Sequence, residues 1–160
     1  MKILLLVTGG RGGSDFFQGL LDGHSQILQF PGVISRGDIS AVLTLKNSYE
    51  ISKKFISTYP QFFNSKLTIN ERHDRLGSKK NKFYKVSKSK FTKNFVKLFN
   101  EKKKLSKINI LKDLHIAYDL AKGKKKHKKK IVFVHTHLMD YTKKFLKFID
   151  TKDIAIIHTM

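Results

Sequence analysis

Cysteine is absent from the sequence, and acidic residues are scarce, with 12 Asp and Glu against 33 Lys and Arg. The lack of cysteine excludes a disulfide-stabilised fold, a thiolate zinc site and a cysteine nucleophile. Long apolar runs are lacking too, and none approaches the roughly 20 residues that span a bilayer. The first apolar run, Ile3–Val7, is shorter than a secretory signal core and leads into glycines. We therefore expect a cytoplasmic protein.

What is present indicates a folded chain. Hydrophobic residues make up 40% of the sequence, including 13 Phe, which a disordered polycation would not carry. The length of 160 residues fits one domain over 1–160. The net charge of +21 is concentrated in residues 46–130, which carry +20 and which we interpret as a basic helical insertion. A genome biased toward A and T explains most of these lysines, and their field would still attract an anionic ligand.

Short apolar runs separated by amphipathic segments predict an α/β fold. After Ile3–Val7, a helix is expected to start with Ser14 as its cap and to end at Gly23. Tyr141 and Phe145 mark another helix near the end of the chain. Strands that alternate with helices pair in parallel, so we expect a three-layer sandwich with a central parallel sheet. We predict strands near residues 2–8, 131–135 and 153–158.

The middle of the chain is less regular. We predict one helix over Ile39–Tyr59 and mostly loop over Phe62–Val86. Two further amphipathic helices are marked by apolar residues at helical spacing: Phe91, Phe95, Leu98 and Phe99, then Ile108, Leu111 and Tyr118. His115 lies within the second stripe, and we expect it, like His24, to be structural. Lys124–Lys130 is expected to be a solvated connection.

A glycine-rich segment joins the first strand to the first helix. Backbone N–H groups at glycines and the amino end of a helix both bind anions. Arg11 adds a fixed charge and Ser14 a hydroxyl. We interpret the segment as a P-loop-like phosphate or sulfate cradle made of Gly10, Arg11, Gly12, Gly13, Ser14 and Asp15. It is not a Walker loop, because no Lys precedes Ser14, nor a dinucleotide loop, because Asp15 stands where glycine is required.

This segment resembles the 5′-phosphosulfate loop of the sulfotransferases that use 3′-phosphoadenosine 5′-phosphosulfate (PAPS). That loop follows the first strand and reads Lys/Arg, Ser/Gly, Gly, Thr/Ser, a variable or hydroxyl residue and an apolar one. The matching residues are Arg11-Gly12-Gly13-Ser14-Asp15-Phe16. Gly19–Ile27 is similar to the helix end of the family, often Leu-Leu-Asp-x-His-Pro-x-Ile, with Ser25 in the place of Pro. Asp15 departs from the Thr of many members and brings a negative charge near the anion.

A second similarity lies far downstream, where His137 ends a predicted strand. Site residues gather at such strand ends, and histidine titrates near neutral pH. Val134-His135-Thr136-His137-Leu138 resembles the Lys-Thr-His-Leu-Pro of the cytosolic sulfotransferases. His135 replaces the Lys and Met139 the Pro. The resemblance implies that His137 is the general base, that Arg11 stabilises the leaving phosphate, and that PAPS donates a sulfuryl group to a hydroxyl or amine acceptor. The acceptor would be a small molecule, a glycan or a lipid.

Other readings stay open. One alternative is a P-loop-like protein with other phosphoryl chemistry. Against it, this sequence has neither the Walker Lys nor an Asp after the strand at 131–134. A non-catalytic nucleic-acid-binding protein would use the basic segment 46–130. Against that function, only four of the basic residues are Arg, and the aromatic residues fall at core spacing. We expect no specific nucleic-acid partner. We also expect no bound metal, since only His135 and His137 have the spacing of metal ligands. The oligomeric state is open.

The position of the last predicted strand bears on whether the domain is complete at its carboxyl end. In the sulfotransferases a comparable strand is followed by Arg-Asp/Asn-Pro, which opens the 3′-phosphate site. Here the strand at 153–158 is followed only by the last residues of the sequence, up to Met160. The resemblance therefore implies a partial or inactive sulfotransferase domain, incomplete at its carboxyl end, that binds PAPS weakly and turns over little.

Overall fold

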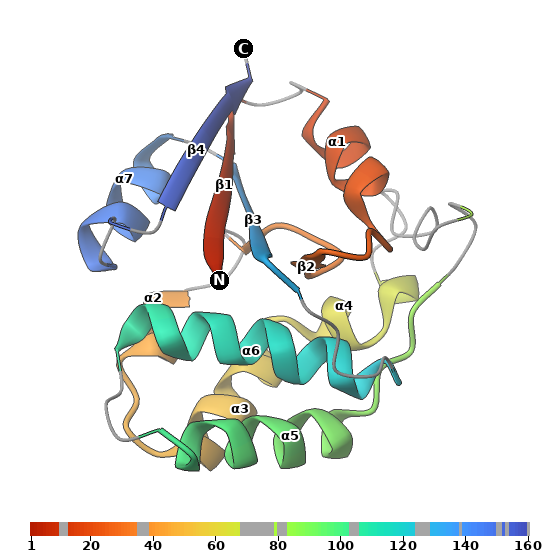
Figure 1. Cartoon of the computed structure of the whole chain (residues 1–160), viewed down its shortest axis with the longest axis vertical. Coiled ribbons are helices and arrows are strands. Elements are labelled where there is room, and N and C mark those ends of the chain that lie inside the picture. The colour runs from red at the N-terminus through yellow and green to blue at the C-terminus, as the bar shows by residue number, and fades with distance from the viewer. Residues whose placement is uncertain are drawn as a thin grey trace.

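The computed structural model describes residues 1–9, 13–34, 39–67, 79, 83–102, 106–123, 129–137, 139–149, 152 and 154–159. Four parallel strands form a central sheet with helices on both faces (Figure 1). In chain order the elements are β1 (Lys2–Thr8), α1 (Ser14–Leu21), β2 (Ile27–Gln29), α2 (Ile39–Leu43), α3 (Ser48–Thr58), α4 (Pro60–Phe63), the short 3-10 helix η2 (Ser65–Leu67), α5 (Lys88–Asn100), α6 (Lys107–Ala121), β3 (Ile131–His137), α7 (Met139–Phe148) and β4 (Ile154–Thr159).

The strand β1 lies in the middle of the sheet, in the order β2-β3-β1-β4. Its partners on both sides run parallel to it, and Thr8 at its carboxyl end is in register with His137 of β3 and Thr159 of β4. Ile3, Leu5 and Leu6 are fully buried. Such burial explains why β1 reads as a continuous apolar run, which is typical of a parallel strand covered on both faces.

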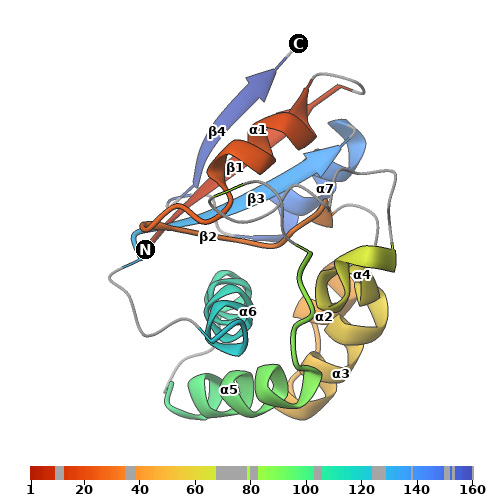
Figure 2. The ribbon, with the colours of Figure 1, turned by 90° about the vertical axis from the view of Figure 1, so that its right-hand side faces the viewer.

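Side chains alternate along β3 between two different helices. Phe133 contacts the ring of Phe17 in α1, with ring centroids 6.2 Å apart. The hydroxyl of Thr136 lies 2.8 Å from that of Thr142 in α7. Successive residues of a strand point to opposite faces, so α1 covers one face of the sheet and α7 the other. Figure 2 shows this arrangement, with α1 in front of β1 and α7 behind β3.

A phenylalanine-rich helical layer lies beside the sheet (Figure 2). The helix α5 packs against α3 and α6, while α6 contacts β2 and α3 contacts the segment that follows β2. Phe30, which follows β2, contacts Phe55, Phe62, His115 and Tyr118. Apolar residues three or four positions apart lie on one side of a helix, which places Phe91, Phe95 and Phe99 of α5 in the same core.

The structure confirms most of the elements expected from the sequence. Parallel strands occur at β1, β3 and β4, although β3 extends two residues beyond the predicted 131–135. The amphipathic helices α5, α6 and α7 are present. Gly23 has the left-handed φ of 82° expected of a residue that ends a helix.

Four expectations were wrong or incomplete. The single helix over Ile39–Tyr59 is interrupted, because the side chain of Asn47 accepts hydrogen bonds from two backbone N–H groups and caps α3 afresh. The helix cap before α1 is Gly13, so Ser14 is the first helical residue and not its cap. The short strand β2 was missed: its first residue, Ile27, ends the stretch compared with a helix end, and no element was predicted for the two residues after it. Within Phe62–Val86, η2 and a bridge between Asn64 and Lys85 add order to a predicted loop.

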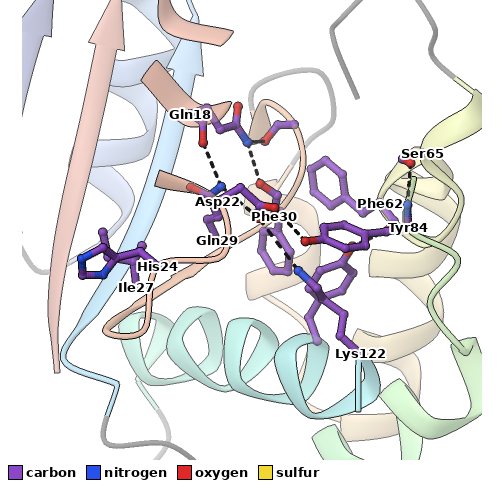
Figure 3. A network of polar contacts seen from close by, with 12 residues as sticks. Gln18, Asp22, His24, Ile27, Gln29, Phe30, Phe62, Ser65, Tyr84 and Lys122 are labelled. Carbon is purple, nitrogen blue, oxygen red and sulfur yellow. Dashed lines mark hydrogen bonds and ion pairs between the residues drawn. The ribbon is translucent and has the colours of Figure 1, made fainter. Parts of the chain in front are cut away.

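A buried polar network joins α1 to the helical layer (Figure 3). The amide nitrogen of Gln29 donates to the backbone oxygen of Gln18 at 3.0 Å and to the carboxylate of Asp22 at 3.2 Å. The hydroxyl of Tyr84 donates to Asp22 at 2.7 Å. Lys122 lies 3.9 Å from the same carboxylate, with its ammonium 3.7 Å from the centre of the Tyr84 ring. Asp22 therefore connects α1, β2, α6 and the segment before α5.

The Tyr84 hydroxyl is expected to contribute measurably to stability. Tyr84→Phe removes a hydrogen bond to a carboxylate that is 3% exposed, so the free energy of unfolding should fall by about 1.5–3 kcal/mol. Urea unfolding measures the change. The matched control is Tyr49→Phe, because Tyr49 is 52% exposed and should shift stability by no more than about 0.5 kcal/mol. Equal effects of the two substitutions would show that the network is not stabilising.

Candidate functional site

The carboxyl edge of the sheet brings the two sequence motifs together. Thr8 ends β1 and leads into the glycine segment, and its register partner in β3 is His137. The amino end of α1 returns to this edge only a few residues after Thr8 (Figure 1). Ligands of open parallel sheets bind beyond the carboxyl ends of the strands, where connections leave to opposite faces. The connection after β1 leads to α1 and that after β3 to α7, which are such opposite faces.

The glycine segment is described only at its two ends. Gly10, Arg11 and Gly12 lie outside the described residues, and so do the side chains of Ser14 and Asp15. Gly13 has a φ of 71°, a left-handed conformation that glycine adopts without strain. The first helical bond runs from the N–H of Phe17 to the oxygen of Gly13, and no side chain caps the helix. The N–H groups of residues 14–16 precede that bond, and such groups bind anions.

Two histidine rings lie at the same edge, on the face of the sheet that α1 covers. His135 and His137 are in contact, with ring centroids 4.6 Å apart and a T-shaped arrangement. His135 is 1% exposed, while His137, nearer the strand end, is half-buried. This partial exposure is compatible with the proton-accepting role predicted for His137. The role itself stays a prediction.

Gln18 of α1 fixes the ring of His135. Its amide nitrogen donates to the backbone oxygens of Phe30 at 2.6 Å and Gly32 at 3.4 Å. The amide oxygen therefore faces His135, whose Nδ1 lies 2.9 Å away. An amide oxygen only accepts, so this network assigns the proton of His135 to Nδ1 and leaves the Nε2 lone pair bare. Burial first, and the neighbouring His137 second, lower the pKa of His135 to about 3, which keeps the ring neutral at neutral pH.

The described residues near the two histidines do not supply a full set of metal ligands. No group of three or more His, Asp, Glu or Cys side chains converges in the described part of the chain. The pair His135 and His137 gives at most two nitrogen ligands, and Nδ1 of His135 is occupied by Gln18. Tetrahedral zinc sites need three or four protein ligands.

The two histidines expected to be structural lie away from this edge. His115 is buried in α6, where its Nδ1 lies 2.8 Å from the oxygen of Leu111 and its ring contacts that of Phe30 in a tilted arrangement. Burial lowers its pKa to about 4. His24 is exposed and accepts a hydrogen bond from the N–H of Gln26 in the turn after α1.

Sequence reasoning missed Thr8 and Gln18. Thr8 looked like the last residue of a strand, yet its hydroxyl is buried at the carboxyl edge. Gln18 looked like a polar residue of an amphipathic helix, yet it is 5% exposed and orients His135. For Thr8, the change from apolar residues to a hydroxyl just before the glycines was a usable signal. For Gln18, only the folded structure shows which side of α1 is buried.

The neutral, buried histidines predict a pH-dependent stability. In the unfolded chain a histidine has a pKa near 6.5, whereas His115 and His135 have folded values of about 4 and about 3. Below pH 6.5 the unfolded state therefore binds more protons, and the free energy of unfolding falls as the pH falls from 7.5 to 5. Urea unfolding across this range measures the slope. His115→Gln should make this pH dependence of the free energy of unfolding shallower. An unchanged dependence in the variant would contradict the assignment of His115 as a buried, neutral group.

The comparisons with known proteins found no relative of this chain. No family model matches the sequence, and neither a curated protein nor a solved structure matches the chain. Among the described helices, none combines the length and apolar character that crossing a membrane requires.

Proposed function

We propose that the chain is a PAPS-dependent sulfotransferase domain that transfers a sulfuryl group to an acceptor with a hydroxyl group. The observation that carries the proposal is the register of Thr8 with His137. The two segments that resemble the sulfotransferases, one following β1 and one ending β3, lie near opposite ends of the sequence. The strand ends that adjoin them, Thr8 of β1 and His137 of β3, lie at one edge of a parallel sheet, which supports the proposal.

The residues present fit the 5′-phosphosulfate. The amino end of α1 has no side-chain cap, and Gly13 takes the left-handed conformation that turns backbone N–H groups toward an anion. We assign the phosphate oxygens to the N–H groups of Gly12, Gly13 and Ser14, within the P-loop-like cradle that also includes Gly10 and Asp15. Arg11 would lie against the bridging oxygen, where its charge stabilises the leaving phosphate.

The chemistry needs few groups from the chain. When bound, PAPS supplies the sulfuryl group, whose sulfur bonds to the acceptor oxygen as its bond to the 5′-phosphate oxygen breaks and leaves the electron pair there. His137 takes the proton of the acceptor hydroxyl as general base. Because β3 places His137 beside Thr8, the base lies next to the segment that would hold the leaving phosphate.

Removal of Arg11 tests the cofactor site. Arg11→Ala should weaken the binding of adenosine 3′,5′-bisphosphate by about 10- to 100-fold, the effect of losing a charge-assisted hydrogen bond. Isothermal titration calorimetry on the full chain measures it. Two controls each remove one charge elsewhere, Lys125→Ala and Lys93→Ala of the exposed side of α5, and should change the affinity less than threefold. Similar losses in all three variants would mean non-specific attraction by the basic surface.

A salt titration separates the proposal from nucleic-acid binding. A protein held to DNA by phosphate contacts loses affinity steeply as salt rises. Retention on an adenosine 3′,5′-bisphosphate matrix should survive a salt concentration that removes the chain from DNA. Release from both at the same salt concentration would favour a general polyanion-binding surface.

A further inference from the structure

Two buried polar atoms lie unsatisfied at the carboxyl edge of the sheet. The hydroxyl of Thr8 and the Nε2 of His135 each belong to a side chain that is 1% exposed. Neither atom has a hydrogen-bond partner in the part of the chain that the structure describes. A buried polar group without a partner costs about 1–3 kcal/mol, so native structures contain few of them. A ligand that supplies the missing bonds would remove this cost.

Thr8 and His135 lie on one face of the sheet, in neighbouring strands. Leu6 is the register partner of His135, and Thr8 comes two residues later in β1, so both side chains point to the same side. That side is covered by α1, because Nδ1 of His135 contacts Gln18. The amino end of α1 lies at the same edge of the sheet. We call Thr8 and His135 together the edge pair.

Other unsatisfied atoms in the described residues have different surroundings. The carboxylate of Asp113 is paired through its other oxygen with Lys102 at 2.6 Å. Nε2 of His115 lies in the helical core, where the ring contacts Phe30. Gln29 belongs to the network around Asp22. These three are inside the core or at the far end of α1, whereas the edge pair lies where ligands of parallel sheets bind.

The chemistry of the edge pair selects the ligand group. Nε2 of His135 carries a bare lone pair on a neutral ring, so it accepts a hydrogen bond and offers nothing to an anion. Its partner must be an O–H or N–H donor. The positive end of the α1 dipole disfavours an ammonium group there. The Thr8 hydroxyl both donates and accepts, which suits a hydroxyl partner.

We propose that Thr8 and His135 bind a hydroxyl group of the acceptor, adjacent to the hydroxyl that His137 deprotonates, so that the acceptor is a polyhydroxylated molecule such as a sugar. The proposal rests on the proposed function. A hydroxyl has one proton, and the reacting hydroxyl gives it to His137. The hydroxyl that donates to His135 must therefore be a second one, and the contact between the two histidine rings, 4.6 Å apart, places it nearby.

The first experiment uses glycerol as the probe and NMR of the histidine ring nitrogens in the full chain. Glycerol should shift the Nε2 signal of His135 in a saturable way. His115 is the internal control, because it is equally buried and neutral but lies in the helical core, and its signal should not move. A glycol dimethyl ether, which has no hydroxyl donor, should leave both signals unchanged. No shift with glycerol, equal shifts at the two histidines, or equal shifts with both probes would overturn the proposal.

The second experiment uses variants that separate binding from folding. Thr8→Val removes an unsatisfied hydroxyl and keeps the shape, so the melting temperature should stay level or rise, while the glycerol affinity falls by about threefold or more. Thr142→Val is the matched control on the opposite face of the sheet. It breaks the bond to Thr136, so it should lower the melting temperature and leave the glycerol response intact. If Thr8→Val instead lowered the melting temperature and kept the glycerol response, Thr8 would be a structural residue and the proposal would be overturned.

His135→Asn completes the test. Asparagine keeps an N–H donor near Gln18 and removes the acceptor at Nε2, so the chain should stay folded and lose the response to glycerol. A folded variant that keeps the response would overturn the proposal. Binding of adenosine 3′,5′-bisphosphate is measured separately. If the chain binds glycerol at the edge pair but not the bisphosphate, the sulfotransferase function alone is refuted. If it binds the bisphosphate but not glycerol, the role of the edge pair alone is refuted.

Discussion

Parallel pairing of β1 on both sides is the constraint on which the rest of the structure depends. A strand with neighbours on either side satisfies its backbone groups in the sheet, and its side chains must then be buried on both faces. The sequence of β1 meets this condition with apolar residues up to Thr8. Because β3 and β4 run in the same direction, their ends arrive together at one edge. The candidate site lies at that edge, where residues from both ends of the sequence come together.

A single buried amide organises the edge. Gln18 uses its two kinds of polar atom in different directions, with the nitrogen toward the segment after β2 and the oxygen toward His135. This division orients α1 over the sheet and decides which nitrogen of the histidine carries the proton. A buried polar network of this kind is useful only if its members are satisfied. Among the described residues, the polar atoms of the Gln18 side chain have partners on both sides, whereas Nε2 of His135 has none.

The sequence predicted the sheet well and the site less completely. β1, β3 and α5 were predictable because doubly buried strands and one-sided helices leave apolar patterns that depend on local spacing alone. β2 was not, since three residues carry no periodicity. The break before α3 depends on the capping geometry of Asn47, and an asparagine within an apolar helical pattern does not reveal whether it caps. His137 was found by its motif, whereas the burial of Thr8 and the contact of Gln18 with His135 arise from packing between distant segments.

The position of the aromatic residues bears on the meaning of the positive charge. In α5, Phe91, Phe95 and Phe99 are buried, while Lys93 and Lys97 lie exposed on the other side of the same helix. Proteins that bind single-stranded nucleic acid stack bases on exposed aromatic rings set among basic residues. In α5 the rings and the charges are separated by the helix, so this surface supplies an electrostatic field without a stacking platform. Such a field raises the local concentration of any polyanion or anionic nucleotide, and in the proposed function the discrimination between them would come from the carboxyl edge of the sheet.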